Sequence, residues 1–149
     1  IAKGALALNI IPDRNWNLKD PEVAALKREK LHAIAASAQR SGLVIIHGTE
    51  CNKLGQPFFD DLGTEALAPV AGPFRDGVYA AYGHTAMARF CARPLGGEWA
   101  ADTFDGDRFA RNRFYAELGR LLEPGTGAGD RLRAACEAAD PEGILAALR

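Results

Sequence analysis

The run Leu43-Val44-Ile45-Ile46 predicts a buried β-strand, because it is apolar throughout and mostly β-branched. An earlier run, residues 5–11, is apolar at all but one position and ends at Pro12, so it predicts a second buried strand. A helix is expected between them, since Asp20-Pro21-Glu22 is typical of a helix start and Ser41-Gly42 of a helix end. The order strand, helix, strand predicts a βαβ unit with parallel strands.

Helical patterns dominate the rest of the chain. In the helix between the strands, an apolar stripe is expected to face the core, formed by Val23, Leu26, Ile34 and Ala38 with Leu31 beside it. Residues 58–62 suggest a short helical turn. Two helices are expected over residues 73–82 and 85–92, interrupted at Gly83-His84. A turn at 94–97, a helix over 107–122 and two short terminal helices over 130–139 and 141–148 complete the prediction.

The composition is that of an ordinary globular protein, with 149 residues, 48% hydrophobic and 25% charged. The net charge of −1 comes from mixed charges, which gives no basic face for nucleic acid. No apolar run reaches the roughly 20 residues that span a membrane. Three cysteines far apart argue against a disulfide framework and for the cytoplasm. The first residue is Ile1 and the only methionine is Met87, so we expect a trimmed sequence or part of a longer one.

Polar residues follow both predicted strands, at the strand ends where parallel α/β proteins bind ligands. After the second strand, residues 47–56 include Glu50 and Asn52, which offer oxygen ligands for a metal or a substrate. After the first strand, Asp13 could act as a ligand or base, and Arg14 could hold a phosphate or carboxylate. On spacing alone, ordinary solvent-exposed loops are the favoured alternative for both segments.

Other candidate residues have weaker support from the sequence. His84 lies at the expected helix break, where an imidazole could be a general base, a ligand or a partly buried structural group. Asp60 and Asp61 are adjacent, so their side chains are expected to point apart. Cys51 follows His47 by four residues, which raises a nucleophile as an alternative.

Three short strings, in this order and spacing, resemble the C-terminal half of bacterial proteins of the polymerase and histidinol phosphatase (PHP) superfamily. The strings are residues 9–17 (Asn-Ile-Ile-Pro-Asp-Arg-Asn-Trp-Asn), residues 48–61 with Gly-Thr-Glu-Cys-Asn at their start, and residues 82–85 (Tyr-Gly-His-Thr). The resemblance covers roughly residues 6–122.

The resemblance implies an α/β fold, with this chain as the C-terminal part of a parallel, distorted TIM-like (β/α) barrel built from βαβ units. Residues 1–123 would be barrel, 124–129 a linker, and 130–149 a helical tail that packs on the barrel or pairs with a second copy in a homo-oligomer. It also implies a divalent metal (Zn, Mn, Mg or Fe) bound by Glu50, and phosphoester hydrolysis. The family's His-x-His motif is missing from this sequence, as is its late Asp-x-His motif.

Three hypotheses follow for the function. The first is a metal-dependent hydrolase of a small phosphorylated substrate, with Glu50 on the metal and Asp13 and His84 as catalytic residues. Substrate contacts in this hypothesis come from Arg14, Asn15 and Asn52. The second is a non-catalytic, barrel-derived module that binds a ligand or a protein. The third is a different α/β enzyme with Cys51 as nucleophile.

Overall fold

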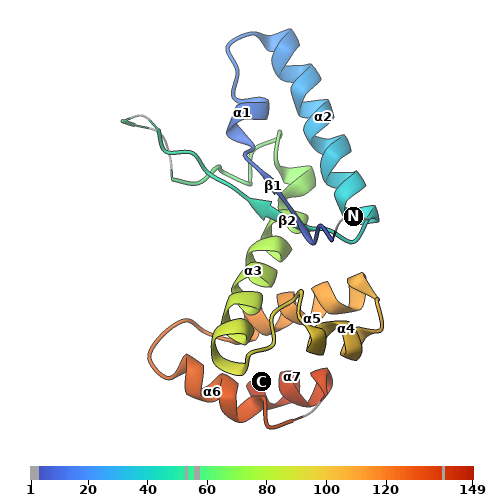
Figure 1. The fold of residues 1–149 in the computed structure, drawn as a ribbon. Helices are drawn as coiled ribbons and strands as arrows, with labels where there is room; N and C mark the ends of the chain where they lie inside the picture. The colour runs from blue at the N-terminus through green and yellow to red at the C-terminus, as the bar shows by residue number, and fades with distance from the viewer. Residues whose placement is uncertain (1–3, 53, 56–57, 139) are drawn as a thin grey trace. The chain divides into compact units, whose positions relative to one another are not determined.

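This computed structural model describes residues 4–52, 54–55, 58–138 and 140–149. The described chain is mostly helical and divides into two compact units, Ile1–Gly77 and Val78–Arg149. The boundary falls within one long helix, α3 (Ala71–Cys91), which contributes residues to both units (Figure 1).

The first unit is built around two parallel strands, as the sequence predicted. Strand β1 (Ala7–Ile10) pairs with β2 (Val44–His47), with Ala7 opposite Val44 and Ile10 opposite His47. Helix α2 (Pro21–Arg40) connects them and packs on β2 (Figure 1). The expected loop after β1 is instead a single helical turn, α1 (Asp13–Trp16), and a 3-10 turn, η1 (Ala68–Val70), precedes α3.

Local signals set the two ends of α2. The Asp20 carboxylate accepts hydrogen bonds from the backbone N–H groups of Glu22 and Val23, and Pro21 occupies the first helical position. The helix stops at Arg40, and Gly42 then adopts a φ of 63° that favours glycine. The expected start and end of this helix are therefore confirmed.

Replacement of this N-cap is expected to destabilise the first unit modestly. Asp20→Ala removes both capping hydrogen bonds and should lower the free energy of unfolding by about 1 kcal/mol. Urea unfolding measures the change, with Lys19→Ala as the neighbouring control that leaves the cap intact. Equal midpoints for the two variants would contradict the capping role.

The buried face of α2 confirms the expected stripe only in part, since Ala38 and Leu31 are buried as predicted and the other three residues are not. Val23, Leu26 and Ile34 are 43–55% exposed, whereas the core-facing residues lie at positions i, i+4 and i+7: Leu31, Ala35 and Ala38. The two alanines let the helix approach the strands closely. The core of this unit adds large residues from the strands, η1 and α3, namely Ile10, Ile45, Leu67, Val70 and Phe74.

The barrel expected from the resemblance is wrong for this structure. Residues 4–52, 54–55, 58–138 and 140–149 contain two strands, which form an open pair. A closed parallel barrel of the TIM type has eight strands. The segment after β2 leads into helices rather than returning to the sheet, because it lacks further β-branched apolar runs.

The expected interruption of α3 at Gly83-His84 is also wrong, because the helix is continuous through both residues. A β-carbon at position 83 would lie 2.1 Å from the carbonyl oxygen of Tyr115 in α5 (Arg108–Leu121). Likewise, a β-carbon added at Gly119 of α5 would lie 2.1 Å from the carbonyl oxygen of Tyr79 in α3. These glycines therefore allow close backbone contact between two helices.

The second unit is helical throughout its described elements. The helix over 107–122 is confirmed as α5, with the Asp107 side chain at its N-cap, and the last helix is confirmed as α7 (Pro141–Leu148). The turn at 94–97 is present, and α4 (Glu98–Phe104) follows it without having been predicted. Helix α6 (Ala128–Ala135) starts two residues inside the expected linker, and residue 139, its expected end, lies outside the described residues.

Two further observations concern the described helices. Residues 58–62 form bends and a turn rather than the expected helical turn, with Asp61 accepting a hydrogen bond from the Gly63 N–H group. Among the described residues, no helix combines the length and the apolar character needed to cross a membrane.

Candidate functional site

The carboxyl ends of β1 and β2 lie side by side, because the parallel register places Ile10 opposite His47. The pairing continues one step further, where the Gly48 N–H group donates a 2.8 Å hydrogen bond to the Ile10 carbonyl oxygen. The polar segments that follow the two strands therefore begin at the same edge of the β1–β2 pair. These segments are α1 after β1 and the described residues of the 47–56 loop after β2; Lys53 and Gln56 lie outside the described residues.

An ion pair joins the two segments at this edge. The Arg14 Nη2 atom donates to the Glu50 Oε2 atom, although the two residues are 36 positions apart in the sequence. Asn52 Nδ2 donates to the same Glu50 oxygen at 3.1 Å. The side chains of Arg14 and Glu50 are 58% and 37% exposed, so a dissolved ligand has access to both. Three of the predicted site residues thus meet in the structure.

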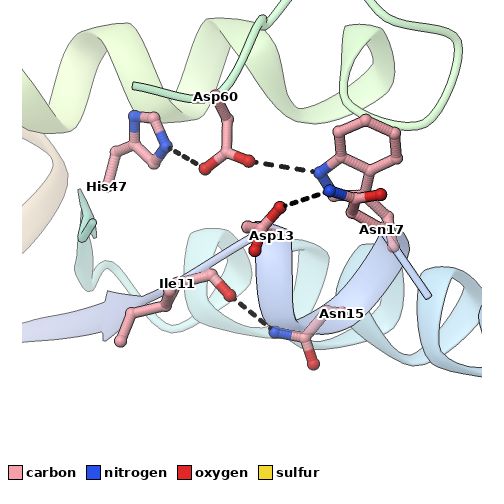
Figure 2. Close-up of polar contacts among 7 residues, drawn as sticks. Ile11, Asp13, Asn15, Asn17, His47 and Asp60 are labelled. Atoms are coloured by element: carbon pink, nitrogen blue, oxygen red, sulfur yellow. Dashed lines mark hydrogen bonds and ion pairs between the residues drawn. The ribbon is translucent and has the colours of Figure 1, made fainter. Parts of the chain in front are cut away.

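Local hydrogen bonds hold the other two predicted residues of α1. Asn15 Nδ2 donates to the Ile11 carbonyl oxygen at 2.8 Å, which ties the helical turn to the end of β1 (Figure 2). Asn17 Nδ2 donates to Asp13 Oδ1, also at 2.8 Å (Figure 2). Asn15 is therefore bonded to the backbone of β1's end, while Asp13 is half-buried with an amide partner.

A buried polar cluster lies at the same edge and was missed by the sequence prediction. His47 Nε2 lies 3.1 Å from Asp60 Oδ2 (Figure 2), and Trp16 Nε1 donates to Asp60 Oδ1 at 3.3 Å. The side chains of His47 and Asp60 are only 6% and 5% exposed, and the His47 ring lies 5.2 Å from that of Phe74. This cluster fastens α1, the end of β2 and the segment before η1 together.

Sequence spacing could not have revealed this cluster. Asp60 follows His47 by 13 positions, and the contact depends on the path of the intervening loop. Asp60 and Asp61 do contact different partners, as their adjacency predicted, since Asp61 accepts from Gly63. Gly48 faces the Asn9 side chain, where an added β-carbon would lie 2.4 Å from Oδ1.

His84 and the other site candidates have distinct surroundings. His84 belongs to the second unit, and its Nδ1 atom accepts a 3.0 Å hydrogen bond from the Leu95 N–H group, which leaves Nε2 as the protonated nitrogen of a neutral ring. His32, on α2, contacts the Ala66 carbonyl oxygen through Nε2 at 2.7 Å. Cys51 is exposed. Catalytic roles for His84 and Cys51 stay predictions.

The described residues do not fit a complete metal centre. Glu50 contributes one carboxylate, whose Oε2 atom already accepts from Arg14 and Asn52. No group of three or more His, Cys, Asp or Glu side chains in the described part of the chain is arranged to hold a metal ion. A catalytic zinc commonly needs three protein ligands. What the site offers in the described residues is a guanidinium, a carboxylate and amide groups on one exposed edge.

Comparison of the chain with protein-family models, with curated proteins and with solved structures gave no match in any of the three.

Proposed function

We propose that the carboxyl edge of the β1–β2 pair binds a small phosphorylated molecule, and that the chain is part of a phosphoester hydrolase. The observation that carries the proposal is the meeting of Arg14, Glu50 and Asn52 at this edge. The proposed reaction class, phosphoester hydrolysis, rests on the resemblance of the sequence strings that contain these residues to the PHP superfamily. We propose the cytoplasm as the location of the protein.

Arg14 is the anion contact in this proposal. A guanidinium presents a planar fork of N–H donors that matches two oxygens of a phosphate group. The exposed pair with Glu50 is worth only about 0–1 kcal/mol, so Arg14 exchanges Glu50 for a phosphate at small cost. Asn52 supplies a neutral amide beside the same position.

Asp13 is the group we assign to proton transfer, since it directly precedes Arg14 on α1 and the residue is half-buried. Asn17 holds one of its oxygens, which fixes the direction of the carboxylate. Asn15 positions α1 through its bond to Ile11 and supports Arg14 from within the same turn. A divalent metal at Glu50 stays a prediction, because the described residues supply one carboxylate for it.

Phosphate binding is expected to depend on Arg14. Titration with inorganic phosphate, followed by NMR chemical shifts, should show Arg14→Ala at least about tenfold weaker than the unaltered chain, since a charge-assisted hydrogen bond contributes about 1.5–3 kcal/mol. Arg14→Lys keeps the charge without the fork and should fall between the two. Arg40→Ala is the matched control, because it removes the same kind of side chain from the C-terminal end of α2, away from the α1 segment that carries Arg14. Equal binding by Arg14→Ala and Arg40→Ala would refute the proposed site.

A second candidate function, a non-catalytic binding module, is supported by the incomplete set of metal ligands among the residues that the structure describes. Elemental analysis and assay with p-nitrophenyl phosphate distinguish the two. Bound metal that is lost in Glu50→Gln, together with turnover, supports the hydrolase. Phosphate binding that needs Arg14 without metal or turnover supports the binding module.

A further inference from the structure

Two cysteines that are far apart in the sequence meet in the second unit. Cys91 is the last residue of α3, and Cys136 is the C-cap residue of α6, 45 positions later. Their sulfur atoms are 2.6 Å apart, and neither is in a disulfide. A disulfide bond has a sulfur separation of roughly 2.05 Å, so a shift of roughly half an ångström would bring the atoms to bonding distance.

The surrounding contacts hold the two thiols in place. Met87, one turn before Cys91 on α3, places its Sδ atom 3.6 Å from the Cys136 sulfur. Leu132, one turn before Cys136 on α6, has its carbonyl oxygen 3.8 Å from the Cys91 sulfur. Met87 and Leu132 are fully buried. The thiol pair therefore lies in a packed seam between α3 and α6 rather than on mobile side chains.

From this geometry we propose that Cys91 and Cys136 are a reversible oxidation site, which closes to an intramolecular disulfide in the presence of a hydroperoxide. Cytoplasmic disulfides in ordinary proteins are commonly of this transient, redox-sensing kind. The site is separate from the proposed phosphate site, which lies in the first unit.

The chemistry proceeds in two steps. The Cys91 thiol first gives its proton to solvent, and the thiolate attacks one oxygen of hydrogen peroxide. The O–O bond breaks, Cys91 becomes a sulfenic acid, and the other oxygen leaves as hydroxide, which takes up the released proton and becomes water. The Cys136 sulfur then attacks the Cys91 sulfur, the S–O bond breaks, and a second water leaves with the Cys136 proton. Two electrons pass from the sulfur atoms to the hydroperoxide, and a dithiol reverses the reaction.

The environment of Cys136 assigns it the second step. Burial, with Cys91 as the next cause, raises the pKa of the Cys136 thiol to about 12, so it is protonated at neutral pH. Arg93 acts in the opposite direction. Its Nη1 atom is buried without a hydrogen-bond partner among the described residues, and its guanidinium lies over the Trp99 ring. Arg93 is thus placed to stabilise negative charge on sulfur as the bond forms.

A disulfide here would hold the C-terminal helices to α3. Helix α7 packs on both α5 and α6, so a bond that fixes α6 to α3 would also restrain α7. Joining residues 45 positions apart also restricts the unfolded chain. For a unit of this size, the expected rise in the unfolding temperature is at least about 8 °C.

The test treats the Cys51→Ser variant of the full chain with hydrogen peroxide, since this background removes the exposed third thiol. Peptide mapping by mass spectrometry should find Cys91 joined to Cys136, with the unfolding temperature raised and both changes reversed by dithiothreitol. Cys91→Ala and Cys136→Ala in the same background should each lose the bond and the temperature rise.

Two results would overturn the proposal. One is that both thiols remain open to alkylation after peroxide treatment of the folded chain. The other is that a bond forms in the Cys51→Ser background only between chains, as seen by a dimer band without reductant. Neither result depends on the stability of the alanine variants, because both are measured with Cys91 and Cys136 intact.

Discussion

Gly77→Ala is expected to destabilise the first unit by about 3 kcal/mol or more, the largest effect of any single methyl group added to it. A β-carbon at this position of α3 would lie 1.7 Å from the carbonyl oxygen of Ile45 and 2.7 Å from its carbonyl carbon. Both atoms belong to the backbone of β2, so no side-chain rotation relieves the overlap. Either α3 moves off the strand pair or β2 shifts against β1.

Urea unfolding, monitored by tryptophan fluorescence, measures this effect. A Trp99→Phe background leaves Trp16 as the fluorescent tryptophan, so the signal reports the unfolding of the first unit. Gly72→Ala is the matched control, because it adds the same methyl group to the first turns of the same helix with no atom within 4 Å. It should be neutral or slightly stabilising, since alanine favours helix over glycine. Similar midpoints for the two variants would show that α3 and β2 are not in this close contact.

These glycines show what the sequence could and could not predict about the helices. The ends of α2 were predictable because Asp20, Pro21 and Gly42 act on the backbone beside them. Glycine is a weak helix former, so the local sequence predicts a break at Gly83. Its actual role depends on Tyr115 of α5, more than 30 residues later in the chain, and a local pattern does not contain that contact.

The barrel was predicted from short sequence strings that resemble the PHP superfamily. These strings lie mainly in the segments after strands, so they do not indicate how many strands the chain forms. The parallel pair itself was predictable, because residues 5–11 and 43–46 are apolar runs of strand length. The buried face of α2 was predictable only in part: Leu31 and Ala38 are buried as expected, whereas the larger Leu26 is 55% exposed and the small Ala35 is fully buried. Alanine at the contact lets the helix lie closer to the strands.

The candidate site also has one part that the sequence could predict and one part that it could not. The sequence implied that the segments with Arg14 and Glu50 follow two parallel strands that end at one edge, but it did not predict the ion pair between them. The contact between His47 and Asp60 depends on how the loop after β2 returns to the strand ends. No periodicity governs such a return, so the buried cluster could be found only in the folded chain.

Asp60→Ala is expected to lower the free energy of unfolding of the first unit by about 2–4 kcal/mol. The change leaves two buried groups without their partner, Trp16 Nε1 and His47 Nε2. Asp60→Asn keeps an oxygen for the indole and should lose less. Asp61→Asn is the control, since the neighbouring Asp61 is exposed and its side chain accepts a hydrogen bond from the Gly63 N–H group, which an asparagine oxygen can also accept. The expected order of stability is therefore Asp61→Asn, Asp60→Asn and Asp60→Ala, from highest to lowest.

The same series separates a purely structural cluster from one that also positions the site. Trp16 lies two residues after Arg14, and His47 lies three residues before Glu50, so Asp60 holds both segments that carry the ion pair. Under conditions where Asp60→Ala remains folded, its affinity for inorganic phosphate should fall several-fold, because misplaced binding groups lose much of their contribution. Unchanged affinity in folded Asp60→Ala would show that Arg14 reaches the phosphate without help from the cluster, and would confine Asp60 to stability.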